Sequence, residues 1–194
     1  YASFNFLNEK SLKDFDKIIL GIDPGTNILG YGLIGINGKQ MTLISTGVVR
    51  MTNLANHQLK LKKIFESITN LIEEYYPDEV AVEAPFYGKN VQSMLKLGRA
   101  QGVAMAATLV KGLPVEEYSP KKIKQSLTGN GASSKEQVAK MIQNLLKLKK
   151  LPKELDATDG IAAAVCHFFQ NNIEKTSNYT GWKDFIKSNP ERFS

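Results

Sequence analysis

Two short apolar runs each end in a carboxylate, and this pattern limits the folds that the chain can adopt. Residues 18–22 (Ile-Ile-Leu-Gly-Ile) precede Asp23, and residues 80–82 (Val-Ala-Val) precede Glu83. Runs of this length and composition are typical of strands that are buried on both faces of a sheet. Ligands gather at the carboxyl ends of such strands, so the two acids predict a site there. Taken alone, either acid could instead cap a turn or a helix.

The segments around these two runs predict a mixed sheet covered by helices. Residues 31–36 and 41–49 flank Asn37-Gly38, a strong hairpin signal, so the chain opens with three antiparallel strands. Apolar periodicity and helix signals predict three helices, over residues 61–75, 90–111 and 155–172. Strands with helices inserted between them imply an α/β domain, and this order of elements is that of the ribonuclease H-like fold.

Weaker signals complete the predicted order. Residues 114–118 are a candidate for a further short strand, and Ser133 with Glu136 forms a capping box that starts another helix. Residues 1–16 are polar and show no clear period. We therefore expect an N-terminal extension over residues 1–16, one α/β domain over residues 17–172, and a C-terminal tail over residues 173–194.

A second pair of acids lies at the start of the last predicted helix. Asp156 and Asp159 are three residues apart, so they share one face of a helix and repel each other. Their neighbours are Ala, Thr and Gly, followed by the apolar residues 161–165, which is not the pattern of a solvated helix face. The alternative is a pair of acids favoured by the dipole at a helix N-terminus.

Together the four carboxylates predict a metal site. Two strand ends and one helix face would form a cage of hard oxygen ligands, which suits Mg²⁺, with Mn²⁺ as a substitute. Two ions about 4 Å apart would activate a water and stabilise the leaving oxygen of a phosphodiester. We expect Asp23 to bridge the two ions, since the central strand places it deepest in the site.

The composition argues against a membrane-spanning or disulfide-stabilised protein. No apolar run approaches the roughly 20 residues that a membrane span needs, and no segment has the pattern of a signal peptide. The single cysteine, Cys166, cannot form an internal disulfide, which favours the reducing cytoplasm.

Positive charge is concentrated in one part of the chain. Ten lysines and three glutamates between residues 111 and 153 give a net charge of +7, which exceeds the +6 of the whole chain. A localised basic surface indicates a polyanionic partner, above all nucleic acid. A solubilising, lysine-rich face is the alternative on charge alone.

The motifs around these acids resemble the RuvC family of Holliday junction resolvases. The resemblance runs from about residue 17 to about residue 170 and rests on four motifs in the same order and spacing: residues 19–25 (Ile-Leu-Gly-Ile-Asp-Pro-Gly), 82–86 (Val-Glu-Ala-Pro-Phe) followed by Lys89-Asn90, 97–102 (Leu-Gly-Arg-Ala-Gln-Gly) and 156–164 (Asp-Ala-Thr-Asp-Gly-Ile-Ala-Ala-Ala). The resemblance implies that Asp23, Glu83, Asp156 and Asp159 are the catalytic acids. It also implies a four-way DNA junction as substrate, nicked symmetrically by a homodimer, and a branch-migration motor as a partner.

The resemblance also suggests which residues face DNA. Phe86 corresponds to an aromatic residue that stacks on unpaired bases at the opened junction centre, and Tyr87 follows it in the same loop. Lys124 and Lys135 resemble basic residues near the scissile strand, and Lys135 lies just inside a helix N-terminus. Further lysines are expected to contact the DNA backbone without reading its sequence: Lys121, Lys122, Lys147, Lys149 and Lys150. Lys89, in the second motif, is also expected to bind DNA. Any one of these side chains could instead be structural or merely solvated.

The two histidines are interpreted as structural. His167 lies eight residues beyond Asp159, about 12 Å along a helix, which is too far to share its ion. His57 starts a lysine-bearing helix and receives the same interpretation. The small residues Gly98, Gly102 and Ala106 form a row that could serve internal packing or a partner helix.

Two other functions fit parts of the sequence. An actin-like kinase or ATPase shares the fold and the turn after the first strand, but it would need a second glycine-rich phosphate loop and a larger second lobe. A non-catalytic module that only binds junctions would be expected to lose at least one acid, and all four are present.

Overall fold

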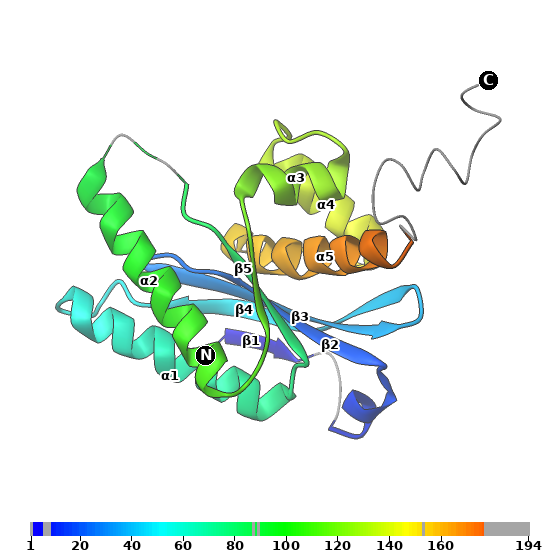
Figure 1. The fold of residues 1–194 in the computed structure, drawn as a ribbon, viewed down its shortest axis with the longest axis horizontal. Coiled ribbons are helices and arrows are strands. Elements are labelled where there is room, and N and C mark those ends of the chain that lie inside the picture. Colours follow the sequence, from blue (N-terminus) through cyan, green and yellow to red (C-terminus); the bar gives the residue numbers. More distant parts are fainter. Residues whose placement is uncertain (1, 6–8, 87, 89, 153, 177–194) are drawn as a thin grey trace, which may run out of the picture.

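A computed structural model describes residues 2–5, 9–86, 88, 90–152 and 154–176, and these form a six-stranded mixed sheet (Figure 1). The strands are β1 (Ala2–Asn5), β2 (Lys17–Asp23), β3 (Ile28–Asn37), β4 (Gln40–Arg50), β5 (Glu79–Glu83) and β6 (Val115–Tyr118). Their order across the sheet is β1-β4-β3-β2-β5-β6. The pairs β1–β4, β4–β3 and β3–β2 are antiparallel, whereas β2–β5 and β5–β6 are parallel.

Helices cover both faces of this sheet. Two helices, α1 (His57–Tyr75) and α2 (Val91–Val110), share one face, and three others, α3 (Pro120–Thr128), α4 (Lys135–Leu145) and α5 (Leu155–Thr176), share the other (Figure 1). A 3₁₀ helix, η1 (Glu9–Asp14), precedes β2. None of the helices in the described ranges is both long and apolar enough to cross a membrane.

The alternation of side chains along the strands builds a core on each face. Ile18, Leu20 and Ile22 of β2 pack into the cluster that includes α1 and α2. Ile19 of β2 and Ala81 of β5 pack into the cluster beneath α3, α4 and α5. Successive residues of a strand point to opposite faces, so a run without polar residues is what a doubly covered sheet requires.

The structure confirms the predicted order of elements from the first hairpin to the last helix. The α/β, ribonuclease H-like prediction is confirmed: the Asn37-Gly38 hairpin, the short strand at residues 114–118 and the three predicted helices are all present. Three elements were not predicted. β1 adds an edge strand next to β4, η1 precedes β2, and α3 follows Tyr118 directly, with Ser119 as its N-cap.

The predicted start of α4 is wrong by one residue. Ser134 is the N-cap and forms the capping box with Gln137, where the sequence predicted Ser133 with Glu136. Ser133 is buried, and its hydroxyl instead lies 2.7 Å from the hydroxyl of Thr128. The serine that already has a hydrogen-bond partner in the α3–α4 loop is not free to cap the helix.

Candidate active site

The four acids predicted from sequence lie at one end of the sheet. β2 ends at Asp23 and β5 ends at Glu83, and the parallel register pairs the preceding residues, Ile22 with Val82. Asp156 lies in the first turn of α5, and Asp159 follows three residues later. Carboxylate oxygens of Asp23, Asp156 and Asp159 lie within 4.8 Å of one another. Glu83 is not one of these three, but it ends the strand next to β2 and therefore lies close to Asp23.

Glycines bring α5 close enough to the sheet for these acids to meet. A Cβ on Gly21 of β2 would lie 2.1 Å from the carbonyl oxygen of Gly160, and one on Gly30 of β3 would lie 1.8 Å from that of Asp156. Either contact is impossible for a real side chain, so α5 can rest on this part of the sheet only where the strands carry glycine. Sequence analysis missed this role, although glycines inside apolar strands are its signal.

Burial and mutual repulsion raise the pKa of Asp23, Glu83 and Asp159. Burial, and next the charge of Asp159, raise the pKa of Asp23 to about 7. Burial, and next the charge of Asp23, raise the pKa of Glu83 to about 8. Burial also raises the pKa of Asp159. A carboxylate shifted in this way is destabilised when it is ionised, and nearby positive charge relieves that cost.

Two lysines, one on α3 and one on α4, supply positive charge near the acids. Lys135, the first residue of α4, places its Nζ 2.6 Å from Oδ2 of Asp159. This hydrogen bond raises the pKa of Lys135 and acts against the rise in the pKa of Asp159. The charge of Lys124 on α3 also acts against the rise in the pKa of Glu83 and of Asp159, so Lys124 lies within electrostatic reach of both.

A cavity of about 820 Å³ begins at Ala84, the residue after Glu83, and lies between the loop after β5, helix α2 and the start of α3. Phe86 lines it and is 73% exposed, so the aromatic ring is not part of the core. Lys121 and Lys124 also line it. On another wall, the side-chain amide of Gln101 donates a hydrogen bond to the carboxylate of Glu117. An exposed aromatic ring beside lysines suits a flexible polyanion with stacking bases.

The other residues predicted to face DNA fall into two groups. Lys121, Lys122, Lys147, Lys149 and Lys150 are exposed, as a backbone contact requires. Tyr87 and Lys89 lie outside the described residues.

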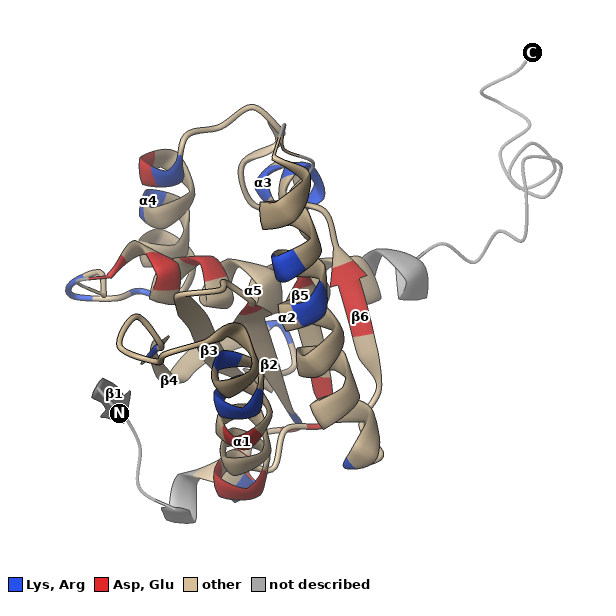
Figure 2. Cartoon of the chain, turned by 90° about the vertical axis from the view of Figure 1, so that its left-hand side faces the viewer, with Lys and Arg blue, Asp and Glu red and all other residues tan. Residues whose placement is uncertain are grey.

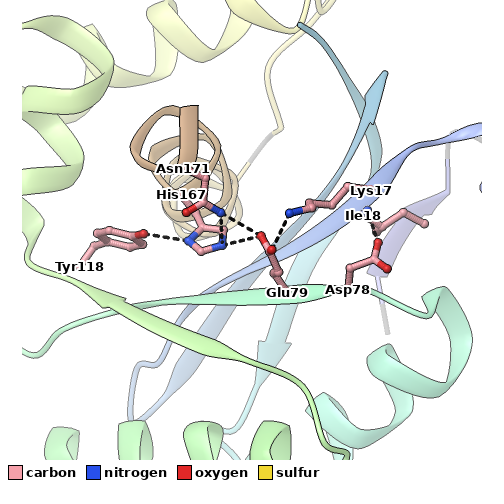
Figure 3. A network of polar contacts seen from close by, with 7 residues as sticks. All are labelled: Lys17, Ile18, Asp78, Glu79, Tyr118, His167 and Asn171. Atoms are coloured by element: carbon pink, nitrogen blue, oxygen red, sulfur yellow. Dashed lines mark hydrogen bonds and ion pairs between the residues drawn. The ribbon is translucent and has the colours of Figure 1, made fainter. Parts of the chain in front are cut away.

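His167 is buried and belongs to a polar network between α5 and the sheet, centred on Glu79 (Figure 3). Its Nδ1 lies 2.8 Å from the hydroxyl of Tyr118, and its Nε2 lies 2.9 Å from Oε2 of Glu79, the first residue of β5. Asn171 and Lys17 also bond to Glu79. The network ties α5 to β2, β5 and β6, which confirms the structural interpretation of this histidine.

Comparison with known proteins identifies close relatives over nearly the whole chain. The profile of the family described as "Crossover junction endodeoxyribonuclease RuvC" matches residues 19–167. The protein of that name from Cytophaga hutchinsonii is 59% identical over 186 residues, which are 96% of this chain and 92% of that protein. The one from Christiangramia forsetii is 57% identical over 186 residues, 95% of this chain and 97% of that protein.

Solved structures agree with the sequence relatives. The structure of Thermus thermophilus RuvC superposes with a TM-score of 0.74 at 31% identity, over 81% of this chain and 96% of that one. A second structure, "T. thermophilus RuvC in complex with Holliday junction substrate", gives a TM-score of 0.76 at 30% identity, over the same shares of the two chains.

Proposed function

Because the chain belongs to the RuvC family of crossover junction endodeoxyribonucleases, we infer that it is a hydrolase that resolves four-way (Holliday) junctions during DNA recombination and repair. The family match spans all four acids. The observation in the structure that carries this inference is the meeting of Asp23, Asp156 and Asp159 within 4.8 Å at the end of the sheet. Such a cluster suits metal-assisted cleavage of a phosphodiester.

We propose that these three acids and Glu83 hold Mg²⁺, with Mn²⁺ as a substitute and two ions in each site. The donor set fits, because carboxylate oxygens are the ligands that these hard cations prefer. The raised pKa values of Asp23 and Glu83 also fit, since a divalent cation offsets the burial and repulsion that disfavour the ionised acids. Bound metal would supply Lewis-acid chemistry for the hydrolysis. Asp23 is the proposed shared ligand, because it neighbours both the acids of α5 and Glu83.

We propose that Lys135 and Lys124 face the scissile phosphate. Lys135 fixes the carboxylate of Asp159 through their 2.6 Å ion pair and adds a positive charge at the edge of the acid cluster. Lys124 lines the neighbouring cavity within electrostatic reach of Glu83. Fixed positive charges stabilise the negative charge that develops on a phosphodiester as it is cleaved.

The remaining contacts with the junction are proposed from exposure and charge. Phe86 is proposed to stack on an unpaired base at the junction centre, since its ring is exposed and lies three residues beyond Glu83. The surface lysines are proposed to bind the DNA backbone, and Tyr87 and Lys89 stay predictions of the same kind. The lysines in this set are Lys121, Lys122, Lys147, Lys149 and Lys150.

We propose a homodimer that meets through α2. A Cβ on Gly98 or Gly102 would contact nothing within 4 Å, and Ala106 is exposed, so this row does not serve internal packing among the described residues. A partner helix could approach it closely, and a two-fold enzyme suits a symmetric junction. A branch-migration motor as partner and a cytoplasmic location follow from the resemblance and from the lack of a disulfide.

The function is tested on a labelled mobile four-way junction and on a linear duplex of the same sequence, with Mg²⁺ and with chelator. Asp23→Asn and Asp156→Asn proteins are compared with the wild type. We expect paired nicks in junction strands that require metal and are lost in both variants. Equal cutting of junction and duplex would sink the substrate assignment. Tight junction binding without cleavage, with Mg²⁺ and also when Mn²⁺ replaces it, would indicate a module that only binds.

A further inference from the structure

A second group of basic side chains lies at the catalytic end of the sheet, on α1 and α2. Burial lowers the pKa of His57, the first residue of α1, and the positive charges of Arg99, Lys96 and Lys60 lower it further. Lys60 belongs to α1, whereas Lys96 and Arg99 belong to α2. Helix α1 packs against α2, which brings Lys60 close to Lys96 and Arg99 although more than 30 residues separate Lys60 from these two in sequence.

No acid among the described residues forms an ion pair with this group. Lys60 donates a 2.6 Å hydrogen bond to the side-chain oxygen of Asn27, which is neutral. Within the described part of the chain, Lys96 and Arg99 form no ion pair, in contrast to Lys111 and Lys135. Like charges that remain close without a counter-ion repel each other, so this arrangement lowers the stability of the protein when no ligand is bound.

The charge distribution along α1 also opposes helix stability. Lys60 and Lys62 lie near its N-terminus, whereas Glu73 and Glu74 lie near its C-terminus. The helix dipole favours the reverse order, with acids at the start and bases at the end. The order Lys62 before Glu66 is likewise the weaker orientation of an i,i+4 pair. Neither the helix dipole nor ion pairing therefore explains why the cations gather at this end.

The location of the group points to its ligand. Asn27 accepts the hydrogen bond from Lys60 and lies in the turn that follows Asp23. Lys60 is therefore close to the acid cluster. Figure 2 shows the acidic bands of α5 in the middle of this end of the molecule, with basic bands on α1 below them, on α2 beside them, and on α3 and α4 above. The acids are thus flanked on both sides by positive charge.

We propose that Lys60, Lys96 and Arg99, which we call the α1–α2 basic surface, bind the sugar-phosphate backbone of one duplex arm of the DNA substrate. The lysines of α3 and α4 bind a different arm on the other side of the acids. A four-way junction sends its arms in diverging directions, so one basic surface cannot follow them all. Contacts to phosphates fix the position of DNA and carry no sequence information. This inference rests on the proposed function and assigns DNA contacts to a part of the chain outside the lysine-rich segment.

The test measures binding of a labelled four-way junction in chelator, over a series of salt concentrations. The variant is Lys96→Glu with Arg99→Glu, since both side chains are exposed and form no ion pair within the described residues. Its control is Lys13→Glu with Lys39→Glu, which makes the same change in charge at the far end of the sheet. We expect affinity for the junction to fall by about tenfold or more in the variant, because two phosphate contacts are lost. The slope of log affinity against log salt should become shallower by roughly two.

The control should bind within about twofold of the wild type, since its charges lie away from the substrate. A milder variant, Lys96→Ala with Arg99→Ala, should show a smaller loss in the same direction. Circular dichroism checks that each protein is folded, and, because Arg99 follows Gly98 of the proposed dimer face, sedimentation checks that each variant keeps the oligomeric state of the wild type. If the wild type cuts junctions but the variant and its control bind equally well, this surface does not contact DNA and the inference is overturned. If the wild type neither binds nor cuts junctions, the proposed function itself fails.

Discussion

Replacing Asp23 by asparagine should make the metal-free protein more stable at alkaline pH, even though the change removes a proposed catalytic acid. The ordinary pKa of this group is 3.8, and burial beside Asp159 raises it to about 7 in the folded protein. Between these values the folded protein keeps a proton that the unfolded chain has released. The free energy of unfolding of the wild type therefore falls as pH rises from about 4 to about 7, and the loss from this group is complete above that.

The size of the effect follows from the shift in pKa. The rise from 3.8 to about 7 is roughly three units, and at 1.36 kcal/mol per unit it corresponds to about 4 kcal/mol near pH 8.5. Near pH 5.5 only about half of this cost, roughly 2 kcal/mol, is present. Because Asp23 titrates together with Glu83, the measured gain is shared between the two acids. We expect the variant to gain about 1–4 kcal/mol near pH 8.5 and less near pH 5.5.

Urea unfolding followed by circular dichroism, at both pH values and with chelator, measures this difference. Glu116→Gln serves as the control, since it removes a carboxylate that is exposed on β6. Added Mg²⁺ should stabilise the wild type and leave the Asp23→Asn protein nearly unchanged, because only the wild type keeps the full set of acids. The reasoning is refuted if the variant is no more stable than the wild type near pH 8.5, or if its gain does not grow with pH.

Three further predictions concern the residues around the acids. Lys135→Ala should lower the cleavage rate by about 100-fold. It should also shift the pH–rate profile to higher pH, because the pKa of Asp159 rises when its ion pair is lost. An unchanged pH–rate profile would argue against a role for this lysine. Gly21→Ala would place a Cβ 2.1 Å from a backbone oxygen of α5, so urea unfolding should show a loss of about 3 kcal/mol or more together with weaker cleavage. Phe86→Ala should weaken junction cleavage by about tenfold or more, and Phe86→Trp should retain cleavage, since stacking contributes about 1–3 kcal/mol per base. The fluorescence of 2-aminopurine at the junction centre reports the stacking. Equal fluorescence with the two variants would contradict the stacking role of Phe86.

Local patterns in the sequence were enough to predict the fold and the four acids. The hairpin at Asn37-Gly38, the apolar runs before Asp23 and Glu83, and the helical spacing of residues 61–75 all depend on neighbours within a few positions. The parallel pairing of β2 with β5 then follows from the fold class, and it places the two strand-end acids together as predicted.

The start of α4 shows where local patterns fail. Ser133 and Ser134 offer the same hydroxyl to the helix, and the contact of Ser133 with Thr128 decides which of them is the cap. That contact depends on how the α3–α4 loop folds back.

Only the tertiary structure decided how the site works. The close approach of α5 depends on Gly21 and Gly30, which lie more than 120 residues away from the helix that they admit. The ion pair of Lys135 with Asp159 connects α4 with α5. Lys60 and Arg99 come close because α1 packs against α2. Composition placed the basic surface in residues 111–153 and missed the cations of α1 and α2, which are dispersed in the sequence. Burial, repulsion and pKa depend on distances in space, and folding sets these distances between residues that the sequence keeps apart.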